Sequence, residues 1–491
     1  MIRTAKYILI LMLGMVFLDA SAQNSQVMYY MNLAQNHLLN PALRPSNTVY
    51  IGLPVLSGMN FNVNNNFVNF SDVFMNSPTG DSVITILHPD YDISRFLPKI
   101  KDINSIEPMV LIQTFGLGFN AGKDLYVFLD INERVDGNVA IPGDLFRLAF
   151  EGNEQFVGSK IDLSSLRGDF KYYREAGLGF SKNFTQRLRI GLKGKVLFGM
   201  AAASIDNNSL GITVNDDYTH TFDADLMVNV SAPVNVYINN ENQIDSLTFD
   251  DSRFDSGSKI VDYLLKSPNM GFGLDIGTEY RFSDRLRISA AVTDIGYIKW
   301  KRDLTNLKAE SQFDFSGLDL LGVYSGTMTF DSLGKELLDS LKNSFSLTDT
   351  KTSFTTYLPF GATVGGSYNL TKSFSLGILS YTRFIGKQIR EALTVSANVN
   401  FGNHFSTSVA YTAMNNRYDN LGFGLAFRAG WFQIYTLADR IPVTWNKITE
   451  SGHKYPVPVS WNTVHFRIGM NLAFGNKVEK KNDKPMMDLT E

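Results

Sequence analysis

Apolar and polar residues alternate along most of this chain with a period of two, the pattern of β-strands that have one apolar and one polar face. The clearest example places Phe272, Leu274 and Ile276 on one face and Asp275 and Glu279 on the other. After a short polar turn the alternation starts again and continues through a second strand. The repeating unit is therefore an antiparallel hairpin.

Such hairpins recur down the chain, and their strands have roughly the ten residues that cross a bilayer at a tilt. Short turns and long polar connections alternate between them, as in barrels whose short turns face the periplasm and whose long loops face the exterior. The first strand is interrupted by Pro54, Ser57 and Gly58, which predict a kink or bulge in the wall. When residues 49–67 are counted as a single kinked strand, the total number of predicted strands is fourteen. The predicted strands span residues 49–67, 110–121, 125–134, 172–182, 188–202, 270–282, 286–300, 354–368, 374–384, 392–401, 405–414, 421–428, 431–438 and 464–474.

The N-terminus has the order of a cleavable secretory signal. Arg3 and Lys6 precede an apolar run over residues 7–18, and small residues follow up to Ala22. The run is too short to cross a bilayer comfortably as a helix. We expect cleavage after Ala22 and export of the mature chain.

An exported chain with this alternation and without a later membrane helix has one main way to span a membrane. It must form a closed barrel, because open sheet edges cannot face lipid. We predict an all-β fold, a transmembrane antiparallel β-barrel of about 14 strands with long extracellular loops, in the outer membrane of a Gram-negative bacterium with both termini periplasmic. The expected divisions are a signal peptide (1–22), an N-terminal plug segment (23–47), the barrel (48–474) and a disordered periplasmic tail (475–491).

Composition narrows the functional classes. The chain has no cysteine, which excludes disulfides, thiolate metal sites and cysteine nucleophiles. Its net charge of −3 does not indicate the basic surface that nucleic-acid-binding proteins have. Hydrolase, nucleotide-binding and metalloprotease motifs are missing from the sequence, so we expect no enzyme, no cofactor and no metal site.

The polar faces of the strands carry charges of both signs, which a barrel would turn toward its lumen. These charges could line a water path, or they could pair with one another and with an inserted plug. We favour pairing, because both signs occur on neighbouring strands. The predicted lumen-facing side chains are Arg189, Lys193, Lys195, Asp275, Glu279, Arg281, Arg287, Arg428, His465 and Arg467.

A resemblance to known families appears just before the first strand. The stretch from Gln26 to Met31, followed by Asn40-Pro41-Ala42, resembles the N-termini of the PorP/SprF and PorV barrels of type IX secretion. Asn40-Pro41-Ala42 is also similar to the FadL-type outer-membrane transporters of hydrophobic compounds. FadL-type and PorV barrels have fourteen strands, so the resemblance implies the same number for this chain, in agreement with the count. In general character the chain resembles Bacteroidetes barrel families of unassigned function.

Two functions are consistent with this resemblance. The first is a FadL-like conduit that takes up or binds a hydrophobic small molecule and releases it through the wall at Pro54, Ser57 and Gly58. The alternative is a PorV/PorP-like barrel, closed by its plug, that docks with a secretion or surface-attachment complex. Expected partners are therefore outer-membrane lipid and either a hydrophobic small molecule or a secretion-complex protein, with no nucleic acid.

Overall fold

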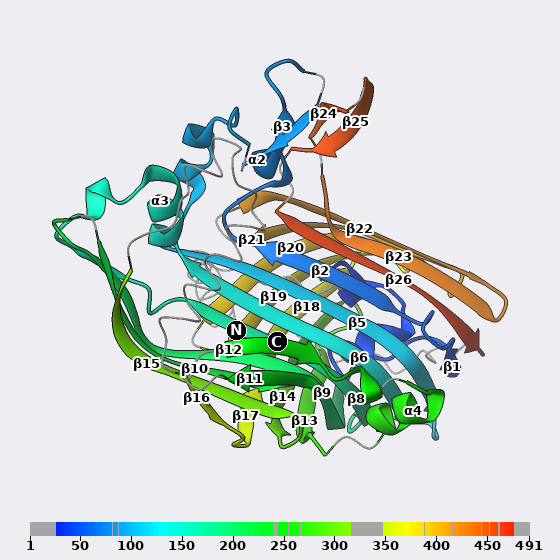
Figure 1. Ribbon diagram of the computed structural model, residues 1–491. Helices are drawn as coiled ribbons and strands as arrows, with labels where there is room; N and C mark the ends of the chain where they lie inside the picture. Colours follow the sequence, from blue (N-terminus) through cyan, green and yellow to red (C-terminus); the bar gives the residue numbers. More distant parts are fainter. Residues whose placement is uncertain are drawn as a thin grey trace, which may run out of the picture.

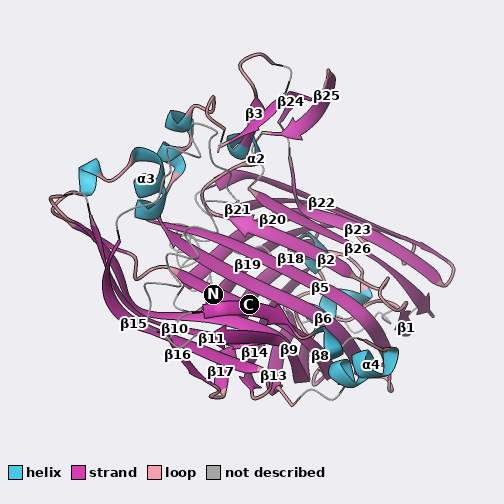
Figure 2. Cartoon of the chain, viewed as in Figure 1, coloured by secondary structure: helices cyan, strands magenta, loops and turns pink. Residues whose placement is uncertain are grey.

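The computed structural model describes residues 26–475 except 81, 87, 218, 239–243, 254, 266–267, 316–346, 387, 415–416, 443, 451 and 460–461. The described residues form an all-β structure built around a closed antiparallel barrel of 14 strands (Figure 1; Figure 2). The predicted signal peptide and nearly all of the predicted tail lie outside these residues. No helix in the described part of the chain is long and apolar enough to cross a membrane.

The wall is a continuous ladder in sequence order, apart from its first strand, which is made of two pieces. Both pieces pair with the second wall strand and with the last one, and this pairing closes the barrel. The wall strands are β1 (Val49–Gly52) with β2 (Met59–Asn65), β5 (Ile103–Asn120), β6 (Leu125–Pro142), β8 (Arg167–Asn183), β9 (Leu188–Val214), β13 (Met270–Arg281), β14 (Leu286–Trp300), β17 (Phe354–Tyr357) with β18 (Phe360–Asn369), β19 (Phe374–Ile385), β20 (Gln388–Phe401), β21 (Phe405–Met414), β22 (Arg417–Ala429), β23 (Phe432–Ile441) and β26 (Thr463–Phe474).

Every predicted strand has a counterpart in this wall, and the prediction of about fourteen is confirmed. The largest difference is β9, which continues to Val214 rather than ending at residue 202. Beyond the wall, β9 pairs with β10 (His220–Ser231), and β10 pairs with β15 (Leu304–Phe315). Sequence periodicity missed this extension because residues near Asn207 are polar on both faces of the strand.

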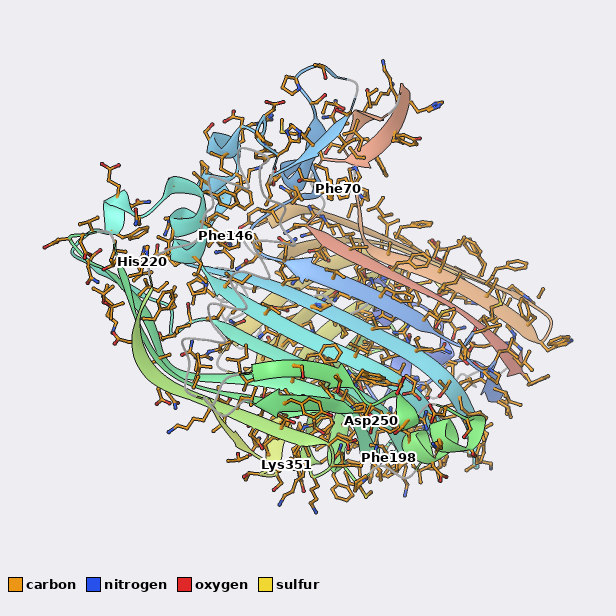
Figure 3. The ribbon with its side chains drawn as sticks, in the orientation of Figure 1. Phe70, Phe146, Phe198, His220, Asp250 and Lys351 are labelled. Carbon is orange, nitrogen blue, oxygen red and sulfur yellow. The ribbon has the colours of Figure 1, made fainter. Side chains whose placement is uncertain are left out.

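The long connections build smaller pieces outside the wall, and those made by residues 70–76, 143–151 and 445–458 lie beyond the end of the barrel opposite the short turns (Figure 1). Phe70 and Phe146 both lie at this end (Figure 3). An apolar cluster there packs Phe67, Phe96 and Ile100 against Phe146. Helix α3 begins directly after Pro142. The spacing of leucines over residues 333–345 predicts another helix, which lies outside the described residues. The pieces are α2 (Phe70–Val73), β3 (Phe74–Asn76), β4 (Val83–Thr85), α3 (Gly143–Glu151), β7 (Lys160–Asp162), β11 (Val234–Ile238), β12 (Ile244–Phe249), α4 (Gly257–Leu265), β16 (Leu347–Thr350), β24 (Trp445–Glu450) and β25 (His453–Pro458).

The barrel has an apolar outer face and a polar inner face. On β13, Phe272 and Ile276 are 55% and 44% exposed on the outside, while Asp275 is 1% exposed on the inside. The same alternation leaves apolar side chains exposed around the wall, among them Val364, Ile378, Val395, Val409, Phe423 and Phe466. Exposed aromatic side chains lie beside the short turns, namely Phe184, Phe282, Phe401, Trp431 and Phe474.

Candidate functional site

The bore of the barrel holds the N-terminal segment, defined here as residues 26–47. Its first helical turn, η2 (Gln26–Tyr30), begins with backbone amides that have no partner within the turn. The carboxylate of Asp439 on β23 accepts from the amides of Gln26 (3.1 Å) and Val27 (2.9 Å). Near its other end the segment reaches β8, where the Ser181 hydroxyl donates to the Ala42 carbonyl at 3.0 Å. The segment therefore contacts strands that lie well apart around the wall, β23 and β8.

The Asn-Pro-Ala motif lies where the segment meets β13 and β14. Asn40 accepts from the Ala42 amide at 2.9 Å, which forms the turn that Asn and Pro favour. Its amide group also donates to the hydroxyl of Tyr29 (3.0 Å) and to the Thr278 carbonyl (3.3 Å). Burial raises the pKa of Tyr29 to about 12, so its hydroxyl stays neutral. Asn40 thus joins two parts of the segment to the wall.

Wall glycines make room for the segment. A Cβ on Gly277 would overlap the Asn40 side chain, and one on Gly191 would overlap the backbone of Pro41. A Cβ on Gly365 or Gly377 would likewise overlap Tyr30, and one on Gly422 or Gly424 would overlap Val27. The inner wall is therefore shaped to fit residues 26–47.

We expect Gly277→Val to weaken docking of the segment. Overpacking of this kind costs about 1–3 kcal/mol, which corresponds to a docking equilibrium weakened by roughly 5- to 150-fold. Limited proteolysis in detergent micelles should then cleave residues 26–47 faster. Gly194→Val is the matched control, because among the described residues a Cβ there would meet no atom within 4 Å. Equal cleavage of the two variants would contradict the fit.

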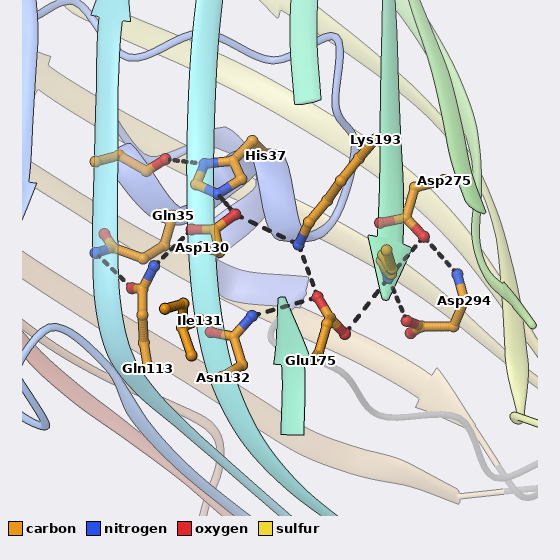
Figure 4. Close-up of polar contacts among 12 residues, drawn as sticks. Gln35, His37, Gln113, Asp130, Ile131, Asn132, Glu175, Lys193, Asp275 and Asp294 are labelled. Atoms are coloured by element: carbon orange, nitrogen blue, oxygen red, sulfur yellow. Dashed lines mark hydrogen bonds and ion pairs between the residues drawn. The ribbon is translucent and has the colours of Figure 1, made fainter. Parts of the chain in front are cut away.

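A charged cluster lies in the bore beside the segment (Figure 4). Its first part centres on Lys193 of β9, whose Nζ lies 2.8 Å from Glu175 and 3.4 Å from Asp130. Asp130 also contacts Nε2 of His37 in the segment at 2.8 Å. All four side chains are at most 1% exposed. A buried ion such as these requires partners, and here each partner is another member of the cluster.

The second part of the cluster centres on Lys195, two residues along the same face of β9. Its Nζ lies 2.7 Å from Asp275 and 2.5 Å from Asp294, and Arg134 of β6 joins Asp294 to Glu175 at 2.7 and 2.9 Å. Asp294 reaches the bore because the ladder is irregular at this point, and its own φ of 64° is unusual for a residue other than glycine. Such irregularities turn a side chain that would otherwise face outward.

The predicted wall kink is an interruption of six residues, 53–58, between β1 and β2, which we call the wall break. Val55 and Leu56 are exposed, and Val55 has a φ of 66°, a strained value for a β-branched residue. Backbone bonds still close the wall on both sides, since the Met470 amide donates to Leu56 (2.7 Å) and the Gln113 amide donates to Gly58 (2.8 Å). The break is therefore a closed outward bulge.

On its inner side the wall break is bonded to the N-terminal segment. The Ser57 carbonyl accepts from the Gln35 side chain at 3.1 Å and from the Tyr435 hydroxyl at 2.8 Å. Gln35 also donates to Asn471 of β26 at 2.7 Å. One residue of the segment thus contacts both the break and the neighbouring strand. Pro54 lies on the exposed side of the break, away from this contact.

The other predicted lumen charges lie outside the charged cluster. Arg189 pairs with Glu279 at 3.1 Å, and Arg281 and Arg287 are cross-strand neighbours at the turn of their hairpin. Arg467 is 2% exposed near the wall break. The sequence predicts Lys193, Lys195 and Asp275 of the cluster as lumen-facing charges. It does not single out the remaining members, which are Asp130, Arg134, Glu175, Asp294 and His37.

A small cavity lies between the segment and the wall. Its volume is ≈ 10 Å³, which is room for about one water molecule. A larger molecule could enter this part of the bore only if the segment moved. The cavity is lined by Gln26, Tyr29, Leu39, Thr293, Thr363, Leu379 and Tyr381.

The fold and the bore define a closed antiparallel β-barrel whose lumen holds its own N-terminal segment. The chain belongs to a family of unknown function, DUF5723, whose sequence pattern matches residues 41–439. No sequence among the curated proteins matches it.

Similar solved structures include a Pseudomonas aeruginosa FadL homologue, with 9% identity, 94% of this chain and 99% of that chain covered, and a TM-score of 0.41. The Pseudomonas putida toluene transporter TodX has 8% identity, coverage of 93% and 96%, and a TM-score of 0.34. A mutant of TodX, described as a monoaromatic hydrocarbon channel, has 8% identity, coverage of 90% and 94%, and a TM-score of 0.38. Since these scores are low, the fold assignment here rests on the strand pairings described above.

Proposed function

We propose that this protein is an outer-membrane barrel that takes up a hydrophobic small molecule through its bore. The observation that carries the proposal is the contact of Gln35 with the Ser57 carbonyl. It joins the element that fills the bore to the element where the wall ladder is interrupted, so displacing the segment would remove one of the contacts that hold the break.

The outer face of the barrel supports a membrane location. Water-soluble proteins rarely expose a contiguous apolar patch of more than a few hundred Å². Here apolar side chains are exposed on strand after strand, and aromatic side chains lie beside the short turns, where the girdles of membrane barrels lie. We propose that the short turns face the periplasm, together with the first and last residues of the wall, Val49 and Phe474, which pair with each other at that end.

The route follows from the contacts of the segment. An apolar molecule that entered from the loop end would meet the small cavity at Tyr29 and Leu39 and would have to displace the segment. Displacement withdraws Gln35 from Ser57 and leaves the break held by its bonds to Met470, Gln113 and Tyr435. Apolar cargo that leaves there enters the bilayer directly, without crossing the polar part of the bore.

A reversible disulfide tests whether the segment must move. A Cβ on Gly424 would lie 2.7 Å from Cγ1 of Val27, one carbon–carbon bond from the Val27 Cβ, within reach of disulfide geometry. We expect Val27→Cys with Gly424→Cys to take up radiolabelled toluene, used as an apolar probe, at the rate of barrel-free cells when oxidised. Reduction should restore uptake to the rate of the Gly424→Cys single variant, in which the added Cβ already crowds Sδ of Met31 (2.5 Å).

The absence of native cysteines makes the two single variants clean controls. Neither should respond to oxidant or reductant. Uptake at the full rate by the oxidised double variant would contradict a route that needs the segment to move.

A second candidate function is docking with a secretion or surface-attachment complex. It is favoured by the sheet of β9, β10 and β15, which extends past the wall and offers an external surface. In that case toluene uptake would equal the barrel-free background in both redox states. A protein would also co-purify at fixed stoichiometry and dissociate when the extension of β9 beyond residue 204 is removed.

A further inference from the structure

We propose that the docked N-terminal segment holds one extra proton, carried by His37 against Asp130, so that a rise in pH releases the segment from the bore. This inference rests on the proposal that the segment can leave, and it adds what controls its departure. The two residues are fully buried and come from the segment and from β6 respectively.

Both ring nitrogens of His37 face groups that can only accept. Nδ1 lies 2.6 Å from the Ala34 carbonyl oxygen, and Nε2 lies 2.8 Å from a carboxylate oxygen of Asp130. A neutral imidazole has one N–H and can satisfy only one of these contacts. The geometry therefore requires a proton beyond those of a neutral histidine and an ionised aspartate.

The surroundings of Asp130 place that proton on the imidazole. One carboxylate oxygen accepts from the Gln113 amide (2.7 Å) and the Tyr50 hydroxyl (3.3 Å), and the other faces His37 and Lys193 (3.4 Å). Gln113, Tyr50 and Lys193 are all placed to donate to this carboxylate, and Lys193 is cationic, so these neighbours favour an ionised Asp130 and leave the proton on the imidazole. Asp130 is therefore the ionised partner of an imidazolium.

The charges of the cluster agree with this assignment. Its carboxylates are Asp130, Glu175, Asp275 and Asp294, and its permanent cations are Arg134, Lys193 and Lys195. Four negative charges face three positive ones when all four carboxylates are ionised and His37 is neutral. A protonated His37 makes the counts equal, which is the condition under which a buried set of ions is tolerated.

The other buried histidine of the bore shows the opposite pattern. In His465, Nδ1 lies 3.3 Å from the backbone amide of Asp439, a donor, while Nε2 lies 2.8 Å from the Asn60 side-chain oxygen. One N–H satisfies both contacts, so the ring is neutral even though an Asp439 oxygen lies 3.2 Å away. His465 is the internal control for His37.

The remaining neighbours of His37 do not titrate with it near neutral pH. Phe128 packs at 4.4 Å and Tyr50 at 6.1 Å between ring centroids, and Tyr126 lies in the same apolar cluster. The segment itself contributes Arg44, which bonds to Ser181 and stays cationic. Lys193 and Glu175 are already paired with each other.

The direction of the pH effect follows from proton linkage. A histidine released into water is neutral above about pH 6.5, so docking above that pH must take up one proton. Below about pH 6.5 the protonated His37 contributes its full stabilisation to the docked state. Above it, the docking equilibrium constant falls about tenfold for each unit by which the pH rises, until the docked pair also loses its proton.

The test is a titration of the full-length protein in lipid nanodiscs with ¹⁵N-labelled histidine, in which His37→Gln identifies the His37 signals. At pH 7.5 we expect both His37 ring nitrogens to be protonated and His465 to have one N–H. Amide exchange of residues 26–47, corrected for intrinsic rates, should lose roughly tenfold protection per pH unit from 7 to 9.

The variant Asp130→Asn keeps the hydrogen bond between residue 130 and His37 but removes the need for the extra proton. A neutral His37 can donate to Ala34 and accept from the new amide, so docking should persist while its pH dependence disappears. His465→Gln should keep the wild-type pH dependence. A His37 ring with one N–H at pH 7.5, or an unchanged pH slope in Asp130→Asn, would overturn the inference. Because these readouts measure protonation and docking, they stand apart from the toluene assay, and either proposal can fail alone.

Discussion

Deletion of residues 26–44 is expected to convert the barrel into an open, water-filled pore. Barrels of eight strands are filled by their own side chains, whereas those of sixteen or more enclose a channel, so a fourteen-stranded wall leaves a bore that something must fill. Residues such as Met28, Leu33 and Ala34 are fully buried within it. We expect the single-channel conductance in planar bilayers to rise by at least roughly tenfold.

The deletion should also change ion selectivity. It removes His37 and leaves four carboxylates against three permanent cations in the charged cluster. The open pore should therefore prefer cations, and Asp275→Asn in the same background should reduce that preference. Circular dichroism and heat-modified gel migration would establish that the shortened chain still forms its barrel. An intact barrel with unchanged conductance would mean that another part of the chain fills the bore.

The wall of the barrel could be predicted because its signal is local. Each strand has an apolar outward face and a small or polar inward face, so alternation alone locates it. For β21 the predicted and observed bounds agree, Phe405–Met414. The turns between such strands are short and polar, and they fix the order of strands without further information.

The site was harder to predict because its contacts join distant parts of the chain. His37 and Asp130 are separated by 93 residues, and the sequence carries no signal that they meet. The motif at Asn40 was visible, but the reason for it lies in Gly191 and Gly277 on two other strands. Strand alternation locates a face, and only the closure of the barrel decides which residues of the inner faces are neighbours.

Asp294 shows a different limit. In strict alternation with Ile288 and Val292 it would face outward. The irregularity opposite Asp275 shifts the phase of β14 and brings Asp294 into the bore, with its amide donating to Asp275 at 2.6 Å. A single extra residue in a ladder changes the side of the wall on which a charge lies. The alternation of apolar residues gives almost no sign of such a shift, so the position of Asp294 could not be predicted from it.

Lys195→Met is expected to destabilise the barrel by about 3–5 kcal/mol, because it leaves two buried carboxylates, Asp275 and Asp294, without their shared cation. Urea unfolding in lipid vesicles, followed by tryptophan fluorescence, measures the loss. Lys182→Met, at an exposed position near the end of β8, should change stability by less than about 0.5 kcal/mol. Asp275→Asn added to Lys195→Met should recover a large part of the loss, because Asp294 keeps Arg134 and the double variant removes the carboxylate that has lost its cation. If Lys195→Met and Lys182→Met unfold at the same urea concentration, the cluster contributes nothing to the closed state. A recovery in the double variant instead shows that charge balance, rather than the packing of the lysine stem, holds the inner wall together.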